Sequence, residues 1–106
     1  MATGQSGTIY LLHFDRRYKH AGHYIGWTTN LPARLRDHTA GHAGRLIAVC
    51  IAEGIGFTLA RTWQGPRAEE RRIKKMGGAS RSCPICAAQR KAAKLAARET
   101  DRAVAA

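Results

Sequence analysis

The side chains of this chain that could do chemistry together are two phenols, a guanidinium, an imidazole and a carboxylate. Tyr10 and Tyr24 each lie in a short apolar stretch. Arg34 and His38 follow one helical turn apart, and Glu70 lies far downstream in a charged segment. An arginine can hold phosphate oxygens, a phenol or imidazole can move a proton, and a carboxylate can hold a divalent cation. These groups are suited to metal-assisted cleavage of a phosphodiester bond.

The charge of the chain is strongly basic and indicates a polyanionic partner. Among 106 residues, Lys and Arg number 18 and Asp and Glu number 7, which gives a formal net charge of +11. Nucleic acid is the partner that this balance favours, and we expect DNA. No apolar run approaches the ~20 residues that span a bilayer, so we expect no membrane partner. The small, polar N-terminus is unlike a secretory signal, which predicts a cytoplasmic protein.

Three segments have the composition of β-strands. Residues 8–14 and 23–28 are rich in β-branched and aromatic side chains, and residues 57–63 alternate apolar and polar side chains. Residues 15–22 are charged and end in glycine, so we expect them to form a hairpin loop. The phenols of Tyr10 and Tyr24 would then lie on paired strands, where side chains on one face converge.

The other segments favour helices. Asn30 is a good N-cap for a helix that carries Arg34 and His38, and a second helix is expected from Gly65-Pro66 to Met76. Residues 45–53 fit either a buried strand or a short helix. We therefore expect an α+β domain over residues 1–82, followed by a basic, alanine-rich helical tail over residues 83–106.

At these positions the chain resembles the GIY-YIG nuclease superfamily. The segment Gly7-Thr8-Ile9-Tyr10 stands where that family has its first motif, with Thr8 as an extra residue, and Tyr24-Ile25-Gly26 matches the second motif as written. The pattern Glu70-x-x-Ile73-Lys74 resembles the helix that presents the family's metal-binding glutamate. The likeness covers roughly residues 7–76.

The resemblance implies both a fold and an activity. The fold would be a small three-stranded antiparallel sheet flanked by helices, with an extra C-terminal helix. The activity would be that of a metal-dependent endonuclease that hydrolyses DNA, with Mg²⁺ or Mn²⁺ held by Glu70. The catalytic residues that it implies are Tyr10, Tyr24, Arg34, His38 and Glu70.

Each of these assignments has an ordinary structural alternative. Both phenols could be core residues whose hydroxyl groups reach the edge of the core. His38 could face the C-terminal dipole of its helix, and Glu70 could form a surface ion pair with Lys74. Glu69 competes with Glu70 as the metal ligand. The sequence does not decide which tyrosine would activate water.

Basic side chains outside the catalytic set are expected to contact the phosphate backbone. The predicted nucleic-acid-binding residues are Arg34, His42, Arg45, Arg61, Arg71 and Lys74, with Arg67, Arg72 and Lys75 as further cations. Two other functions remain open. One is a catalytically inactive nucleic-acid-binding module of the same fold, because no asparagine follows Glu70 as it does in many family members. The other is a protein-interaction domain whose basic tail docks on an acidic partner. A homodimer also remains open.

The cysteines form no obvious disulfide framework. Cys83-Pro84-Ile85-Cys86 has the spacing of half a zinc site, but a structural zinc site needs four ligands. A histidine or a second subunit could complete the site, whereas Cys50 is expected in the core. We favour two reduced thiols or a redox pair over structural Zn²⁺ at Cys83 and Cys86.

Overall fold

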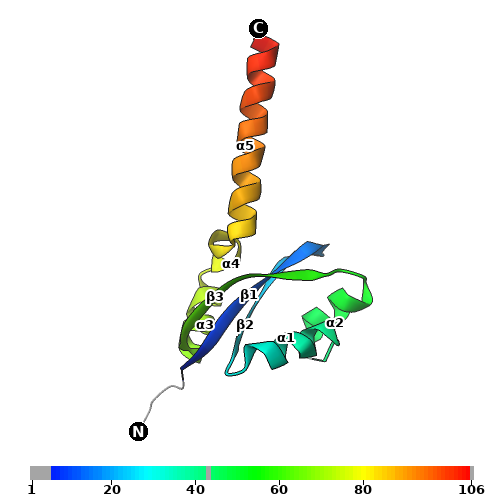
Figure 1. The fold of residues 1–106 in the computed structure, drawn as a ribbon, viewed down its shortest axis with the longest axis vertical. Helices are drawn as coiled ribbons and strands as arrows, with labels where there is room; N and C mark the ends of the chain where they lie inside the picture. Colours follow the sequence, from blue (N-terminus) through cyan, green and yellow to red (C-terminus); the bar gives the residue numbers. More distant parts are fainter. Residues whose placement is uncertain (1–5, 43, 106) are drawn as a thin grey trace.

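The structure is a computed structural model that describes residues 6–42 and 44–105. A three-stranded antiparallel sheet with the order β2-β1-β3 lies at its centre (Figure 1). The strands are β1 (Ser6–Tyr18), β2 (Ala21–Thr28) and β3 (Phe57–Pro66). The helices are α1 (Leu31–Thr39), α2 (Arg45–Ala52), α3 (Arg67–Lys75), α4 (Gly78–Ser82) and α5 (Pro84–Ala105). The expected α+β class, a small antiparallel sheet flanked by helices, is confirmed.

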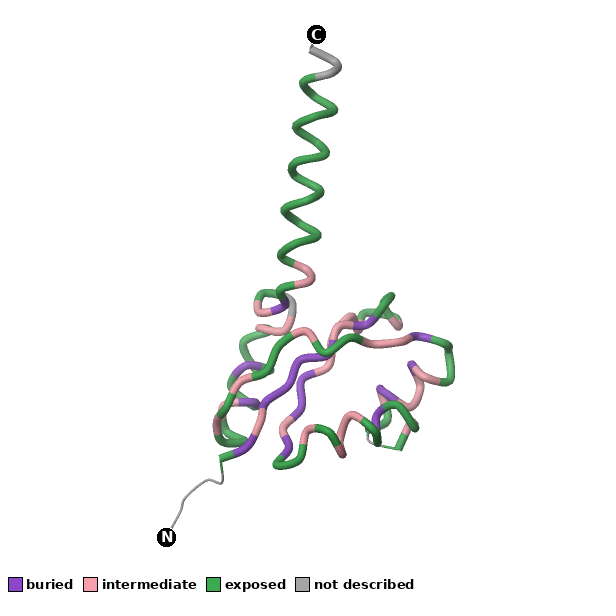
Figure 2. Tube along the Cα trace, in the orientation of Figure 1, coloured by how far each residue is buried: buried purple, intermediate pink, exposed green. Residues whose placement is uncertain are grey.

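The central strand β1 supplies both hydrophobic cores because alternate side chains point to opposite faces of a strand. Tyr10, Leu12 and Phe14 pack on one face against α1 and α2. Ile9 and Leu11 pack on the other face against α3, α4 and the start of α5. Figure 2 shows that the buried residues follow the strands and the helices beside them. The sheet is therefore the middle layer between two groups of helices.

The first hairpin is longer than the sequence indicated. We expected residues 15–22 to be a loop, but β1 continues to Tyr18 and β2 begins at Ala21. The turn is confined to the residues between these strands, where Lys19 has a φ of 56°. The end of the hairpin is largely exposed and its register shifts after His13. The charged residues there are strand residues without a buried face, so they lack the apolar alternation of a half-buried strand.

The helix boundaries largely agree with the sequence. Asn30 caps α1 by accepting a hydrogen bond from the backbone amide of Ala33 at 3.2 Å, and α3 occupies the segment expected before Met76. Residues 45–52 form helix α2, which resolves the choice between strand and helix. The short helix α4 was not expected, because two adjacent glycines, Gly77 and Gly78, follow Met76 in the sequence.

Helix α5 leaves the body of the molecule and extends away from it (Figure 1). It is 22 residues long, and its side chains from position 87 to position 102 are exposed. Only its base contacts the protein, where Ile85 and Cys86 pack against the core beneath β1 and β2. Among the described residues, none of the helices has the length and apolar character needed to cross a membrane.

Candidate active site

The Tyr-Ile-Gly motif has a steric explanation in the sheet. Tyr10 on β1 is paired with Gly26 on β2. A Cβ atom at Gly26 would lie 2.3 Å from both Cζ and Oη of Tyr10. The phenol ring of Tyr10 therefore lies directly across the backbone of Gly26, which only a glycine permits. This contact carries the Tyr10 hydroxyl toward β2, the edge strand, and the ring of Tyr24 lies 6.1 Å away between centroids.

His38 lies behind Tyr10 rather than at the surface. Its side chain is fully buried, and its Nε2 atom forms a 2.6 Å hydrogen bond with the Tyr10 hydroxyl. Its ring also meets the ring of Tyr24 edge-on, with centroids 5.2 Å apart. We expected His38 to reach the same pocket as Arg34. Arg34 does line the pocket, but His38 lies behind the rings of Tyr10 and Tyr24 and does not line it, so direct contact between His38 and a phosphate is not supported.

Tyr10 and Tyr24 border an open pocket with a volume of about 340 Å³. The pocket lies where the edge strand β2 meets α1 and α3. Its charged lining comprises Arg34, Arg67, Glu70, Arg71 and Lys74. Cations thus outnumber the single carboxylate, and the pocket is suited to an anionic ligand.

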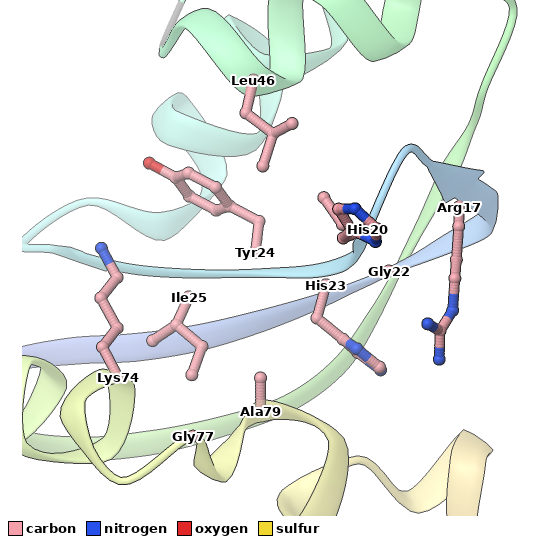
Figure 3. A pocket seen from close by; sticks show the side chains of 11 residues that line it. Arg17, His20, Gly22, His23, Tyr24, Ile25, Leu46, Lys74, Gly77 and Ala79 are labelled. Atoms are coloured by element: carbon pink, nitrogen blue, oxygen red, sulfur yellow. The ribbon is translucent and has the colours of Figure 1, made fainter.

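A second hollow of about 510 Å³ continues along the same edge strand. Tyr24 and Lys74 line both hollows. Figure 3 shows Tyr24 pointing from β2 toward Leu46 on α2, while His23 and Ile25 point to the opposite face of the strand. The edge of β2 therefore borders two hollows, and Tyr24 lies in the wall of both.

The two acidic residues of α3 lie in different places. Glu70 is buried in the pocket wall with a side-chain exposure of 11 %, and it forms a 2.8 Å ion pair with Lys74. Glu69 instead accepts hydrogen bonds from the guanidinium of Arg72 and lines another hollow. These hydrogen bonds and the charge of Arg72 hold the pKa of the Glu69 carboxyl below its usual range. Of the two carboxylates, only Glu70 faces the phenols.

The environment of Tyr10 favours its neutral form. Burial raises the pKa of Tyr10 well above its usual range, and the nearby Tyr24 and Glu70 raise it further, whereas Arg34 lowers it. The shift is upward on balance, so the phenol keeps its proton near neutral pH.

The predicted phosphate-binding residues separate into two groups. Arg34, Arg71 and Lys74 share the pocket, and Arg67 joins them with its guanidinium 4.9 Å from the centre of the Trp27 ring. The others lie elsewhere: Arg61 stacks over Trp63, Arg45 lies beside Tyr18, and His42 is exposed after α1. Nothing in the sequence indicated this division, because cations occur along the whole chain.

The structure also gathers four residues that could hold a metal ion. The ligand atoms of His13, His23, Cys83 and Cys86 all lie within 4.8 Å of one another. The sequence drew attention to Cys83 and Cys86 but missed both histidines. The sequence feature that could have identified them is their position on either side of the predicted hairpin, because His13 and His23 are cross-strand partners. Cys50, as expected, is buried in the other core.

No protein-family model, curated protein or solved structure matched this chain.

Proposed function

We propose that this protein is a divalent-metal-dependent endonuclease that hydrolyses phosphodiester bonds in DNA in the cytoplasm. The observation that carries the proposal is the convergence of Tyr10, Tyr24, Arg34 and Glu70 on one cationic pocket. These residues come from four different elements, so no local sequence preference explains why they meet. The same residues carry the resemblance to the GIY-YIG nuclease superfamily, to which we propose that the chain is related.

Arg34 is the residue that we assign to the scissile phosphate. Its side chain is half-buried on α1 and lines the same pocket as Glu70. A guanidinium presents a planar fork that can hold two phosphate oxygens at once. Arg34 would therefore fix the phosphate and stabilise the negative charge that develops on it during attack. Arg71 and Lys74 would hold the adjoining backbone.

Tyr10 and His38 together form the proton acceptor in this mechanism. Because the pKa of Tyr10 is raised, its phenol does not act as a preformed phenolate. The phenol instead takes a proton from the attacking water while its own proton passes to Nε2 of His38 across their 2.6 Å hydrogen bond. The new bond forms between the water oxygen and phosphorus, the bond to the leaving oxygen breaks, and the leaving oxygen carries off the electron pair and takes a proton from solvent. Tyr24 would orient the water from the other side.

Glu70 is the residue that would hold the cation, and its surroundings fit such a role. A magnesium or manganese ion needs only one or two protein carboxylates, because water and substrate oxygens complete its octahedron. Glu70 supplies one carboxylate in an open pocket with space for those waters. When bound, the cation supplies Lewis-acid stabilisation of the phosphate and the leaving oxygen. Glu70 must exchange its ion pair with Lys74 for the cation, which leaves Lys74 free to contact phosphate.

The same ion pair also favours a second candidate function. Lys74 lies 2.8 Å from the Glu70 carboxylate and could neutralise it permanently. The protein would then be a catalytically inactive module that binds nucleic acid through the same cationic pocket. The two functions differ in turnover, because only the nuclease requires a divalent cation.

The test is cleavage of supercoiled plasmid and branched DNA by the purified protein with Mg²⁺ or with EDTA. We expect nicking that requires Mg²⁺ and that falls about a hundredfold or more in Glu70→Gln. Glu69→Gln is the matched control, because it alters the neighbouring carboxylate outside the pocket and should keep full activity. Salt-sensitive DNA binding without cleavage would support the inactive module. If Glu70→Gln and Glu69→Gln lost the same amount of cleavage activity, Glu70 would have no specific role in the mechanism.

A further inference from the structure

A second site lies on the opposite face of the hairpin from Tyr10 and Tyr24. His13 on β1 and His23 on β2 are directly paired across the two strands. Cys83 lies between α4 and α5, and Cys86 lies in the first turn of α5. Cys83 is fully buried and the other three side chains are half-buried. The chain thus brings residues that are far apart in the sequence to one point beneath the sheet.

Four of the six separations between the ligand atoms of this cluster match those around a tetrahedral ion, and the other two are no longer than 4.8 Å. Nδ1 of His13 lies 3.3 Å from Nε2 of His23 and 3.5 Å from Sγ of Cys83. Sγ of Cys86 lies 3.6 Å from Nδ1 of His13 and 3.2 Å from Nε2 of His23. Tetrahedral zinc with bonds of about 2.0–2.1 Å to nitrogen and about 2.3 Å to sulfur separates its ligands by about 3.3–3.8 Å. The observed separations agree with these edges to within about 0.3 Å.

The chemistry of the ligands selects the metal. Two cysteine sulfurs and two imidazole nitrogens form a combination that suits zinc, whereas magnesium and calcium prefer oxygen. Two thiolates would also balance the charge of Zn²⁺ within a half-buried site. On the side of the core its neighbours are the apolar side chains of Leu11, Ile25 and Ile73, and on the open side they include Arg17. Thiols form only weak hydrogen bonds. Hydrogen bonding alone therefore does not explain why two thiols and two imidazoles are close together.

We propose that His13, His23, Cys83 and Cys86 bind one structural Zn²⁺ ion that fastens the base of α5 to the β1–β2 hairpin. Four protein ligands leave no open coordination position, so this ion would support the fold and take no part in hydrolysis. This attachment would hold α5 in place on the body of the molecule. Helix α5 has few other contacts with the body, since its exposed part begins directly after Cys86.

A zinc site replaces the reduced thiols or redox pair that we favoured at Cys83 and Cys86. That preference assumed that no second pair of ligands was present. The hairpin register supplies the pair, since His13 and His23 face the same side of the sheet as the two sulfurs. The zinc proposal does not depend on the proposed nuclease activity, because Glu70 and the phenols belong to a separate pocket.

The experiment is metal analysis of the purified full-length chain, followed by replacement of its metal with Co²⁺. We expect about one equivalent of zinc per chain and, with cobalt, the visible bands of a tetrahedral ion together with thiolate-to-cobalt charge transfer. Cys86→Ser and His23→Ala should each lose the charge-transfer intensity or the bound metal. The matched controls Cys50→Ala and His20→Ala should keep both, because neither residue belongs to the cluster.

The measurement on the unaltered protein decides the matter even if a variant fails to fold. Zinc content near zero, with no tetrahedral cobalt spectrum, would overturn the proposal. A Cys83–Cys86 disulfide in protein prepared with reductant would overturn it in favour of a redox pair. Glu70→Gln should retain its zinc, so a failure of the nuclease proposal and a failure of the zinc proposal would give different results.

Discussion

At the scale of single residues, the central relation is the contact between Tyr10 and Gly26. The glycine permits the phenol ring to cross the neighbouring strand, and the ring then holds its hydroxyl between His38 and the pocket. One steric requirement thus links Tyr10 of the first sequence segment to Gly26 of the second. Gly26 is therefore needed for the shape of the site.

The steric requirement predicts a large effect of Gly26→Ala. The added methyl group would meet the Tyr10 ring and should destabilise the protein by about 1–3 kcal/mol or more through overpacking. Gly22→Ala on the same strand is the control, since its Cβ would lie 3.5 Å from the nearest atom, an ordinary contact. Chemical denaturation of both variants measures the difference. Equal stability of the two variants would show that the Tyr10 ring does not lie across Gly26.

The proton-transfer role predicts a selective effect of Tyr10→Phe. Loss of the hydroxyl removes the hydrogen bond to His38 and should cost about 1 kcal/mol of stability. The single-turnover cleavage rate should fall about a hundredfold, while DNA affinity stays within about twofold. Tyr18→Phe is the matched control, because it removes a phenol hydroxyl from the same strand outside the pocket. A similar rate for both variants would assign the proton transfer to another group.

At the scale of elements, the sequence predicted the three strands, α1 and α3 because each has a clear pattern or capping residue. The length of β1 and β2 was not predictable, since their exposed ends lack apolar alternation. Residues 45–53 were ambiguous because a short apolar run fits a buried strand and a buried helix equally well. The sequence likewise could not bring His13 and His23 to the cysteines, because that requires the hairpin register and the path of α4.

The zinc attachment predicts how α5 behaves when metal is removed. A strong chelator should loosen the base of α5 and speed tryptic cleavage at the exposed Arg81 by about tenfold through local opening. The sheet should stay folded, because the core formed by Tyr10, Leu12 and Phe14 lies on its other face and contains none of the four ligands. Cys86→Ser is the control, since it should be cleaved rapidly with or without chelator. Cleavage of the unaltered protein that is insensitive to the chelator would contradict the attachment.

At the scale of the whole molecule, cationic side chains are spread well beyond the pocket. The net charge is +11, and the exposed helix α5 carries several of the cations. Basic residues on a helix that extends from the body can reach phosphates distant from the pocket. They would add affinity without reading sequence, because phosphate contacts are the same for every base pair.

This distribution predicts a strong dependence of DNA affinity on salt. If about six phosphates are contacted, affinity should fall about a thousandfold between about 50 and 200 mM monovalent salt. Replacing Lys91 and Lys94 of α5 with glutamine should lower the slope of log affinity against log salt by about 0.9 for each phosphate that the helix no longer neutralises. Fluorescence anisotropy with labelled duplex DNA measures the slope. An unchanged slope would show that α5 does not contact DNA.

Central to the proposed nuclease is a divalent cation held by Glu70 in the pocket that also contains Tyr10 and Arg34. The most direct measurement is anomalous diffraction from crystals of the protein soaked in Mn²⁺. We expect a manganese peak at the Glu70 carboxylate, with the Lys74 ammonium moved away from it and the Tyr10 hydroxyl facing the same space. A Glu70–Lys74 ion pair that persists in saturating Mn²⁺, with no peak in the pocket, would contradict this role of Glu70.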